Sequence, residues 1–167
     1  MTDSTQRFLQ AAGSGDLDAV QSLLAAGLDV DACNAIGYTP LMSAARSYRV
    51  EIVQLLLAAG ADPNRRFEDD NSVLHAATLE TPSQPDRQAT CVRLLLEAGA
   101  DADVPNTAGI TPLMQAAWFG CEPAVAELLD HGADPHAVDT TGRTAQDIAR
   151  ARGHAAIADL LASAMNS

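Results

Sequence analysis

Four histidines and three cysteines are the side chains of this sequence that most readily ligate zinc, and the cysteines are candidate nucleophiles. His131 and His136 form the nearest histidine pair, but they are five residues apart and miss the i, i+4 spacing that places two ligands on one helical face. Cys33, Cys91 and Cys121 are odd in number and far apart, which predicts small buried or half-buried thiols in a reducing compartment. We therefore predict no metal site and no disulfide.

The sequence contains none of the short motifs that mark a catalytic loop. There is no Gly-x-Ser-x-Gly elbow, Walker loop or dinucleotide fingerprint, and the nearest approach to an elbow is Gly13-Ser14-Gly15. Cys121 and His154 occupy equivalent positions of an internal repeat, but no third group is placed to orient them, so a nucleophilic cysteine is not indicated. We predict that the chain is not an enzyme and needs no cofactor. An enzyme with an unrecognised site stays open as an alternative.

The run Glu68-Asp69-Asp70-Asn71 resembles part of a calcium loop in composition. It lacks the glycine and the bidentate glutamate that an EF-hand needs at fixed offsets, which disfavours a cation site. Two other interpretations stay open: a solvated acidic loop tip, and a contact for a basic partner.

The charge balance excludes one class of partner. The chain carries 22 acidic and ten basic residues, a formal net charge of −12, and every basic residue is arginine. Binding to nucleic acid needs a clustered basic face that releases counterions, so we predict no nucleic-acid partner. Residues 1–12 lack the basic and apolar segments of a secretory signal, and no 18-residue apolar run could span a membrane. We predict a cytoplasmic protein without a membrane partner, and arginine without lysine indicates a GC-rich, bacterial genome.

Composition also predicts the fold class. The 167 residues are 47% hydrophobic but only 4% aromatic, so the core must consist mainly of Ala, Leu, Val and Ile. Such a composition favours closely packed helices, and the length is that of one domain. We predict an all-helical protein.

The elements that must position these side chains repeat along the chain. Gly27, Gly60, Gly99 and Gly132 each close an apolar run, at separations of 33, 39 and 33 residues. Within one unit, a threonine caps a first helix, a proline fills its first position, and a glycine in the left-handed conformation ends the second helix. In the second unit these residues are Thr39, Pro40 and Gly60, the turn between the helices lies near Tyr48 and Arg49, and the second helix is predicted over Val50 to Ala59.

The segment from Gly37 to Asn64, GYTPLMSAA through IVQLLLAAGADPN, resembles the ankyrin repeat. The resemblance covers the chain as one domain, 1–167, with repeats near 1–33, 34–66, 67–105, 106–138 and 139–165, the first and last acting as polar caps. It implies an all-α solenoid of stacked helix-turn-helix units with hairpin-like fingers. Met42 and Met114 stand where the family usually has the histidine that His75 keeps, so we expect these methionines to contribute packing.

The resemblance also implies a binding surface. In the family, the positions flanking the glycine of each finger and the two positions after the Ala-Ala of each first helix face the concave side and vary with the partner. These positions are Ile36, Tyr38, Arg46 and Ser47 in the second unit; Asp69, Asn71, Thr78 and Leu79 in the third; Ala108, Ile110, Trp118 and Phe119 in the fourth; and Thr141, Arg143, Ala151 and Arg152 in the fifth. Tyr48 and Glu68, which lie beside them, belong to the predicted protein-binding set. Because Trp, Tyr and Arg dominate interface energetics, an aromatic cluster here predicts a docking face; the alternative is that Trp118 and Phe119 only cover helix ends.

Six extra residues in the third unit account for the longer glycine spacing. The segment Thr81-Pro82-Ser83-Gln84-Pro85-Asp86 is rich in turn residues, so we predict that it bulges from the turn between the two helices and extends neither. A neutral bulge and a partner contact both stay open.

Together these features predict a monomeric, non-catalytic adaptor or inhibitor that binds a protein partner on its concave face. The acidity favours a partner with a basic surface, because opposite charge raises the encounter rate. One version is a bacterial immunity or antitoxin-like protein that covers a basic toxin. A purely structural homo-oligomer is a further alternative.

Overall fold

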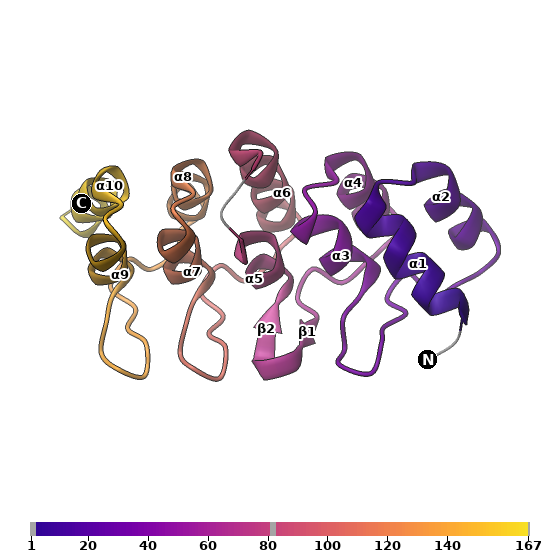
Figure 1. The fold of residues 1–167 in the computed structure, drawn as a ribbon, viewed down its shortest axis with the longest axis horizontal. Coiled ribbons are helices and arrows are strands. Elements are labelled where there is room, and N and C mark those ends of the chain that lie inside the picture. The colour runs from indigo at the N-terminus through magenta and orange to yellow at the C-terminus, as the bar shows by residue number, and fades with distance from the viewer. Residues whose placement is uncertain (1–2, 81–82, 167) are drawn as a thin grey trace.

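Five consecutive helix pairs make up the computed structural model, which describes residues 3–80 and 83–166 (Figure 1). The pairs are α1 (Asp3–Ser14) with α2 (Leu17–Ala25), α3 (Pro40–Arg46) with α4 (Val50–Ala58), α5 (Val73–Thr78) with α6 (Pro85–Glu97), α7 (Pro112–Phe119) with α8 (Glu122–Asp130), and α9 (Ala145–Arg152) with α10 (Ala155–Met165). The only strands in the described part are the two-residue β1 (Arg66–Phe67) and β2 (Asn71–Ser72). The prediction of an all-α solenoid with hairpin-like fingers is confirmed.

Hydroxyl side chains begin the first helix of each of the last four pairs. The Thr39 Oγ1 accepts a hydrogen bond from the Met42 N–H at 3.3 Å, and the Thr111 Oγ1 accepts one from the Met114 N–H at the same distance. Pro40 follows Thr39 at the first helical position, where its missing N–H costs nothing. These contacts confirm the predicted helix start.

Glycines with positive φ follow the second helices of the first four pairs. Gly60 has φ of 89°, and the N–H of the following Ala61 donates to the Leu56 carbonyl at 3.0 Å, which satisfies one of the free carbonyls of the last turn. The helix ends at Ala58, one residue before the predicted Ala59. The predicted turn and second helix of this unit are therefore confirmed to within one residue.

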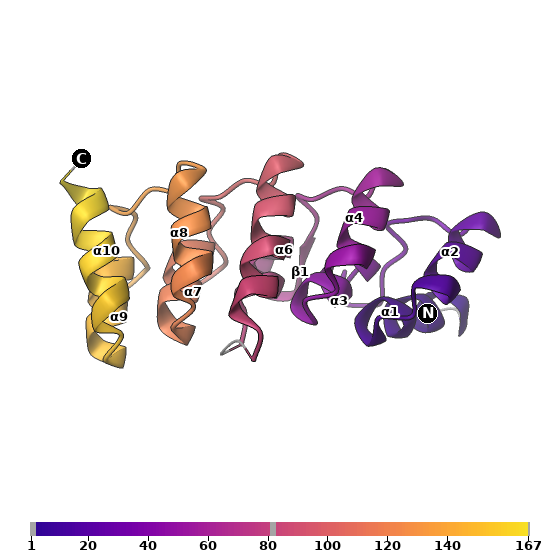
Figure 2. The ribbon, with the colours of Figure 1, turned by 90° about the horizontal axis from the view of Figure 1, so that it is seen from above.

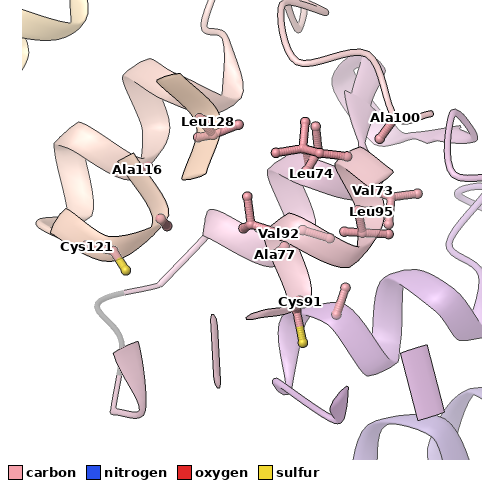
Figure 3. Packing of buried hydrophobic residues seen from close by; sticks show 14 of the residues in the cluster. Val73, Leu74, Ala77, Cys91, Val92, Leu95, Ala100, Ala116, Cys121 and Leu128 are labelled. Atoms are coloured by element: carbon pink, nitrogen blue, oxygen red, sulfur yellow. The ribbon is translucent and has the colours of Figure 1, made fainter. Parts of the chain in front are cut away.

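The helices stack in two rows. Consecutive first helices pack on one another from α1 to α9, and consecutive second helices do the same from α2 to α10 (Figures 1 and 2). Alanine pairs such as Ala76-Ala77 and Ala116-Ala117 are buried in the first row, where their small side chains let the backbones approach closely. Larger side chains fill the space between the rows, as Leu74 of α5 and Leu95 of α6 show in Figure 3.

Four finger loops project from the row of first helices: residues 34–38, 66–72, 106–110 and 139–143 (Figure 1). One backbone hydrogen bond joins each finger to the next: Glu68 N–H to Ile36 carbonyl at 3.0 Å, Thr107 N–H to Asp69 carbonyl at 2.9 Å, and Thr140 N–H to Ala108 carbonyl at 3.1 Å. Asp70 has φ of 58° at the place where the other three fingers have a glycine with positive φ. An aspartate tolerates this conformation better than most residues do, because its short side chain bonds locally.

Carboxylate and amide side chains in the loops before the fingers form hydrogen bonds between successive units. The Asp31 carboxylate accepts from the Asp62 N–H at 3.2 Å, and the Asp103 carboxylate accepts from the Asp134 N–H at 2.8 Å. The equivalent hydrogen bond in the middle of the stack uses the Asn64 Oδ1 and the Asp101 N–H, at 2.9 Å. The same bond therefore recurs at three successive joints.

The six-residue insertion is placed differently from the prediction. Pro85 is the first residue of α6, and Asp86 lies in its first turn, so α6 has 13 residues where α4 and α8 have nine. The prediction that this segment would extend no helix is wrong, because a proline that cannot continue a helix is well suited to start one. Ser83 and Gln84 precede the helix as exposed residues, and Thr81 and Pro82 lie outside the described residues.

Candidate functional site

The fingers and the adjoining first helices form one surface of the stack, which we call the inner face. Two hollows open on it. The apolar hollow, about 360 Å³ in volume, lies between the third, fourth and fifth units, and the polar hollow, about 510 Å³, lies between the second and third units. Both are lined by residues that the sequence singled out.

The apolar hollow brings together six of the predicted residues: Asn71, Leu79, Ile110, Trp118, Phe119 and Arg143. Its remaining walls are Asn106, Met114, Gln115 and Ile148, which sequence reasoning did not select. These four come from finger and helix positions that the repeat assigns to the scaffold: Asn106 is half-buried, and Met114, Gln115 and Ile148 are buried. The repeat register marks these positions as scaffold, so it gives no signal that they line a hollow.

Two arginines lie at this hollow: Arg143 lines it, and Arg152 contacts the lining residue Trp118. The Cζ atom of Arg152 lies 4.4 Å from the centroid of the Trp118 ring, a cation–π contact, and Trp118 as a residue is 38% exposed. Arg143 donates from Nε to the Asp139 Oδ2 at 2.9 Å and forms an ion pair with the same oxygen through Nη2 at 2.8 Å. The Thr141 hydroxyl and Arg143 hold the pKa of the buried Asp139 carboxyl well below its usual range.

Gln115 lies in the wall of the apolar hollow with an unpaired side-chain oxygen. The residue is only 8% exposed, and its Oε1 is buried with no hydrogen-bond partner among the described residues. Buried polar atoms in folded proteins are almost always paired, so this exception needs a physical reason.

The polar hollow is dominated by one ion pair. The Nε of Arg46 donates to the Glu80 Oε1 at 3.1 Å, and the Nη2 of Arg46 contacts the same oxygen. Tyr38 lies beside them, donates its hydroxyl to the Met42 carbonyl at 3.2 Å, and packs edge-on against Phe67 with ring centroids 5.1 Å apart. Ser47 also lines this hollow.

Two predicted contact residues are buried instead. Thr78 is fully buried and donates its hydroxyl to the Leu74 carbonyl at 3.0 Å. It lies six residues after the N-cap Ser72, as the buried Ala45 does after Thr39, so the predicted surface position was one residue out of register. Tyr48 is 7% exposed and adopts φ of 55°, and its hydroxyl accepts from the Gln88 Nε2 at 3.3 Å. Burial raises the pKa of Tyr48 to about 12. Thr78 therefore cannot offer its side chain to a partner, and Tyr48 can offer only the edge that borders the polar hollow.

The remaining predicted residues lie at fingertips. Ile36 is 45% exposed, and Ala108, Glu68 and Asp69 are exposed as well. They lie outside both hollows and form a row that the backbone bonds between fingers keep in register. The acidic run is thus placed on an exposed fingertip, as predicted.

His75 connects the third unit to the fourth. Its Nε2 donates to the Ile110 carbonyl at 2.8 Å, and its Nδ1 accepts from the Ser72 N–H at 3.1 Å. Burial lowers the pKa of His75 to about 4, so the ring is neutral at neutral pH. Met42 and Met114, at the equivalent positions, are buried and contribute packing, as expected from the sequence.

The cysteines and the other histidines form no recognisable reactive group. Burial raises the pKa of the Cys91 thiol to about 12 and also raises that of Cys121, which leaves both thiols protonated (Figure 3). Cys33 is exposed, contrary to the prediction, because it lies in the open loop that leads to the first finger. Within residues 3–80 and 83–166, no three His, Cys, Asp or Glu side chains gather as a metal site would require.

No helix in the described part of the chain combines the length and apolar character that crossing a bilayer requires. The chemistry that the inner face offers is apolar contact, aromatic stacking and hydrogen bonding from arginine and amide groups.

Comparison with known proteins defines the class. A family model for ankyrin repeats, in three copies, matches residues 8–106 and 83–167. The chain belongs to the ankyrin-repeat family. Ankyrin repeats are protein–protein interaction modules and are generally non-catalytic, which gives the coarse function of this chain.

Individual relatives differ in how much of their length this chain covers. The putative ankyrin repeat protein YahD of Escherichia coli (strain K12) is 30% identical, and the match covers 94% of each chain. The ankyrin repeat, SAM and basic leucine zipper domain-containing protein 1 of Carollia perspicillata is 38% identical over 74% of this chain, and that of Dasypus novemcinctus 34% over 79%. The chain spans only 26% and 27% of those two longer proteins.

Proposed function

We propose that this chain is a non-catalytic adaptor or inhibitor that holds a protein partner against its inner face. The observation that carries the proposal is the apolar hollow, where Trp118, Phe119 and Ile110 stand partly exposed although the protein has a large, well-filled core elsewhere. Partly exposed aromatic and aliphatic side chains around a hollow are typical of interface hot spots.

The distribution of charge supports a partner with a basic surface. The net charge is −12, and the fingertip residues Glu68, Asp69 and Asp70 are all exposed. A basic partner would be attracted to these fingertips over a distance of about one Debye length, ~10 Å at 0.1 M salt. The fingertips would orient the partner, and the hollows would then bind it.

Site-specific photo-crosslinking in cells tests the proposal directly. A benzophenone side chain placed by Ser47→p-benzoylphenylalanine lies on the inner face, whereas Gln54→p-benzoylphenylalanine lies on the exposed outer surface of α4. We expect a discrete protein adduct from position 47 and none of the same mass from position 54. Equal adducts from both positions, or an adduct from position 54 alone, would place the partner elsewhere and reject the proposal.

A further inference from the structure

The unpaired side-chain oxygen of Gln115 is the feature of the inner face that the fold alone does not explain. Gln115 is more than nine-tenths buried, lies in the wall of an otherwise apolar hollow, and uses its Oε1 for no hydrogen bond among the described residues. A methionine of similar size would fill the same wall without an orphaned polar atom. The last bond of a glutamine side chain rotates over a broad range, so the amide can turn toward a group that enters the hollow.

The charge around the apolar hollow is opposite in sign to that of the whole chain. Arg143 is the only charged residue among those lining it, and its charge is offset by Asp139. Arg152 lies over Trp118 and pairs with no carboxylate in the part of the chain that the structure describes. Arg152 does not line the hollow itself, but through its contact with Trp118 it places one positive charge without a carboxylate partner beside the apolar wall.

We propose that the apolar hollow binds an extended peptide segment of the partner in which an apolar residue is followed by an acidic one. The apolar side chain would fill the hollow between Ile110 and Phe119. The main-chain peptide group of the segment would pair with the Gln115 amide, and the acidic side chain would pair with Arg152. This proposal rests on the proposed function, since it assigns the chemistry of one part of the same binding face.

Other occupants fit the same hollow less well. A lysine or arginine side chain would be repelled by Arg152, and a nucleic acid is disfavoured by the overall charge. A purely apolar side chain without its peptide group would leave the Gln115 Oε1 unpaired and buried. The partner would then combine a basic surface facing the acidic fingertips with one acidic, apolar segment at the C-terminal end of the stack.

Trp118 makes the test direct, because it is the only tryptophan in the chain and lies in the hollow. The probes are the capped dipeptides acetyl-Leu-Asp-amide, acetyl-Leu-Lys-amide and acetyl-Gly-Asp-amide, with an N-methylated form of the first that lacks the peptide N–H between the two residues. Binding of each is followed by the Trp118 fluorescence and the Trp118 indole N–H signal in NMR titrations.

We expect the Leu-Asp probe to bind about tenfold more tightly than the Leu-Lys probe at low salt and the Gly-Asp probe to bind most weakly. Arg152→Gln should reduce the Asp-over-Lys preference to about twofold or less. Arg150→Gln is the matched control, because it removes the same charge from the same helix at an exposed position outside the hollow and should leave the preference unchanged.

The amide is tested separately. Gln115→Met should lower the affinity for the Leu-Asp probe about fivefold, the factor that the loss of one neutral hydrogen bond gives. It should not lower the affinity for the N-methylated probe. A Leu-Lys probe that binds as tightly as Leu-Asp, equal effects of Arg150→Gln and Arg152→Gln, or an unchanged Trp118 signal with every probe would overturn the proposal. A crosslink from position 47 together with any of these results would leave the proposed function standing and reject only this segment chemistry.

Discussion

The guanidinium of Arg152 lies over the ring of Trp118, with 4.4 Å between the Cζ atom and the ring centroid. A cation–π contact at a partly exposed site contributes about 0.5–1 kcal/mol, which favours one ring orientation over the others. A side chain that is already held in place loses less rotamer entropy when a partner binds to it. The two residues come from neighbouring units, α7 and α9, so the stack itself prepares the contact surface.

Replacing Trp118 by alanine distinguishes a hot spot from a helix-end cover. Because Trp118 is 38% exposed, we expect Trp118→Ala to lower partner affinity by at least about 2 kcal/mol, roughly thirtyfold. The free energy of unfolding should change by about 1 kcal/mol or less. Calorimetric binding of the crosslinked partner and thermal melting, measured on the same samples, check both values.

Thr140→Ala is the control for this experiment, since Thr140 is exposed and contributes to the finger row through its backbone N–H only. It should alter neither quantity. A Trp118→Ala protein that loses about 3–5 kcal/mol of stability, as for a buried tryptophan, yet binds normally when folded would remove Trp118 from the site.

Leu56 tests the packing of the stack. Its side chain is fully buried in α4 between neighbouring units, so Leu56→Ala should lower the free energy of unfolding by about 2–5 kcal/mol. Leu17→Ala, at a position that is 36% exposed, should cost much less. Urea denaturation curves of the two variants beside the wild type measure the difference, and similar losses for both would contradict the assigned core.

Salt dependence tests the role of the acidic fingertips. If charge attraction brings a basic partner to this chain, the association rate constant should fall as the salt concentration rises, while the dissociation rate constant changes little. Stopped-flow measurements at low and high salt give both constants. An association rate constant that does not change with salt concentration would exclude electrostatic attraction and leave the hollows as the source of binding.

His75 predicts a loss of stability in mild acid. Its pKa is about 4 in the folded protein and about 6.5 in the unfolded chain, so between these values the unfolded chain binds a proton that the folded protein does not. The contribution of His75 to the free energy of unfolding should therefore be fully present above pH 6.5. The free energy of unfolding should then fall by up to about 3 kcal/mol as the pH approaches 4. Denaturation curves at a series of pH values measure it.

Methionine is a suitable replacement for His75 in a control variant, because Met42 and Met114 occupy the equivalent position in two other units. His75→Met should fold and lose most of the dependence between pH 6.5 and 4. The carboxyls of Asp139 and Asp147, whose pKa values are lowered, lose their contribution only at lower pH. An unchanged pH profile in the variant would assign the effect to another group.

Much of the fold could be predicted because it depends on local rules that repeat. The hydroxyl of Thr39, the ring of Pro40 and the missing side chain of Gly60 each act within a few residues, and their recurrence fixed the unit. What could not be predicted were the places where one unit departs from the others. Tyr48 adopts a left-handed φ at the register position where other units have Gly120 and Gly153, and this backbone conformation accompanies the burial of its ring.

The site was predicted in part for the same reason. The register identified Trp118 and Ile110 as surface positions, since any side chain there points to the inner face. It could not identify Gln115, because the orphaned state of an amide depends on the side chains around it in three units at once. Thr78 was assigned to the surface by an error of one residue in the register, since its counterparts Ala45 and Ala117 are buried as well.

The hydrogen bonds in the loops before the fingers have a mechanical consequence. Hydrogen bonds between Asp31 and Asp62, Asn64 and Asp101, and Asp103 and Asp134 fasten the first four units to one another along the row. A tensile load applied to the two ends of such a row passes through every joint in series, so each joint bears the same force. The joint that yields first therefore sets the strength of the whole stack, and the units on either side of it stay folded.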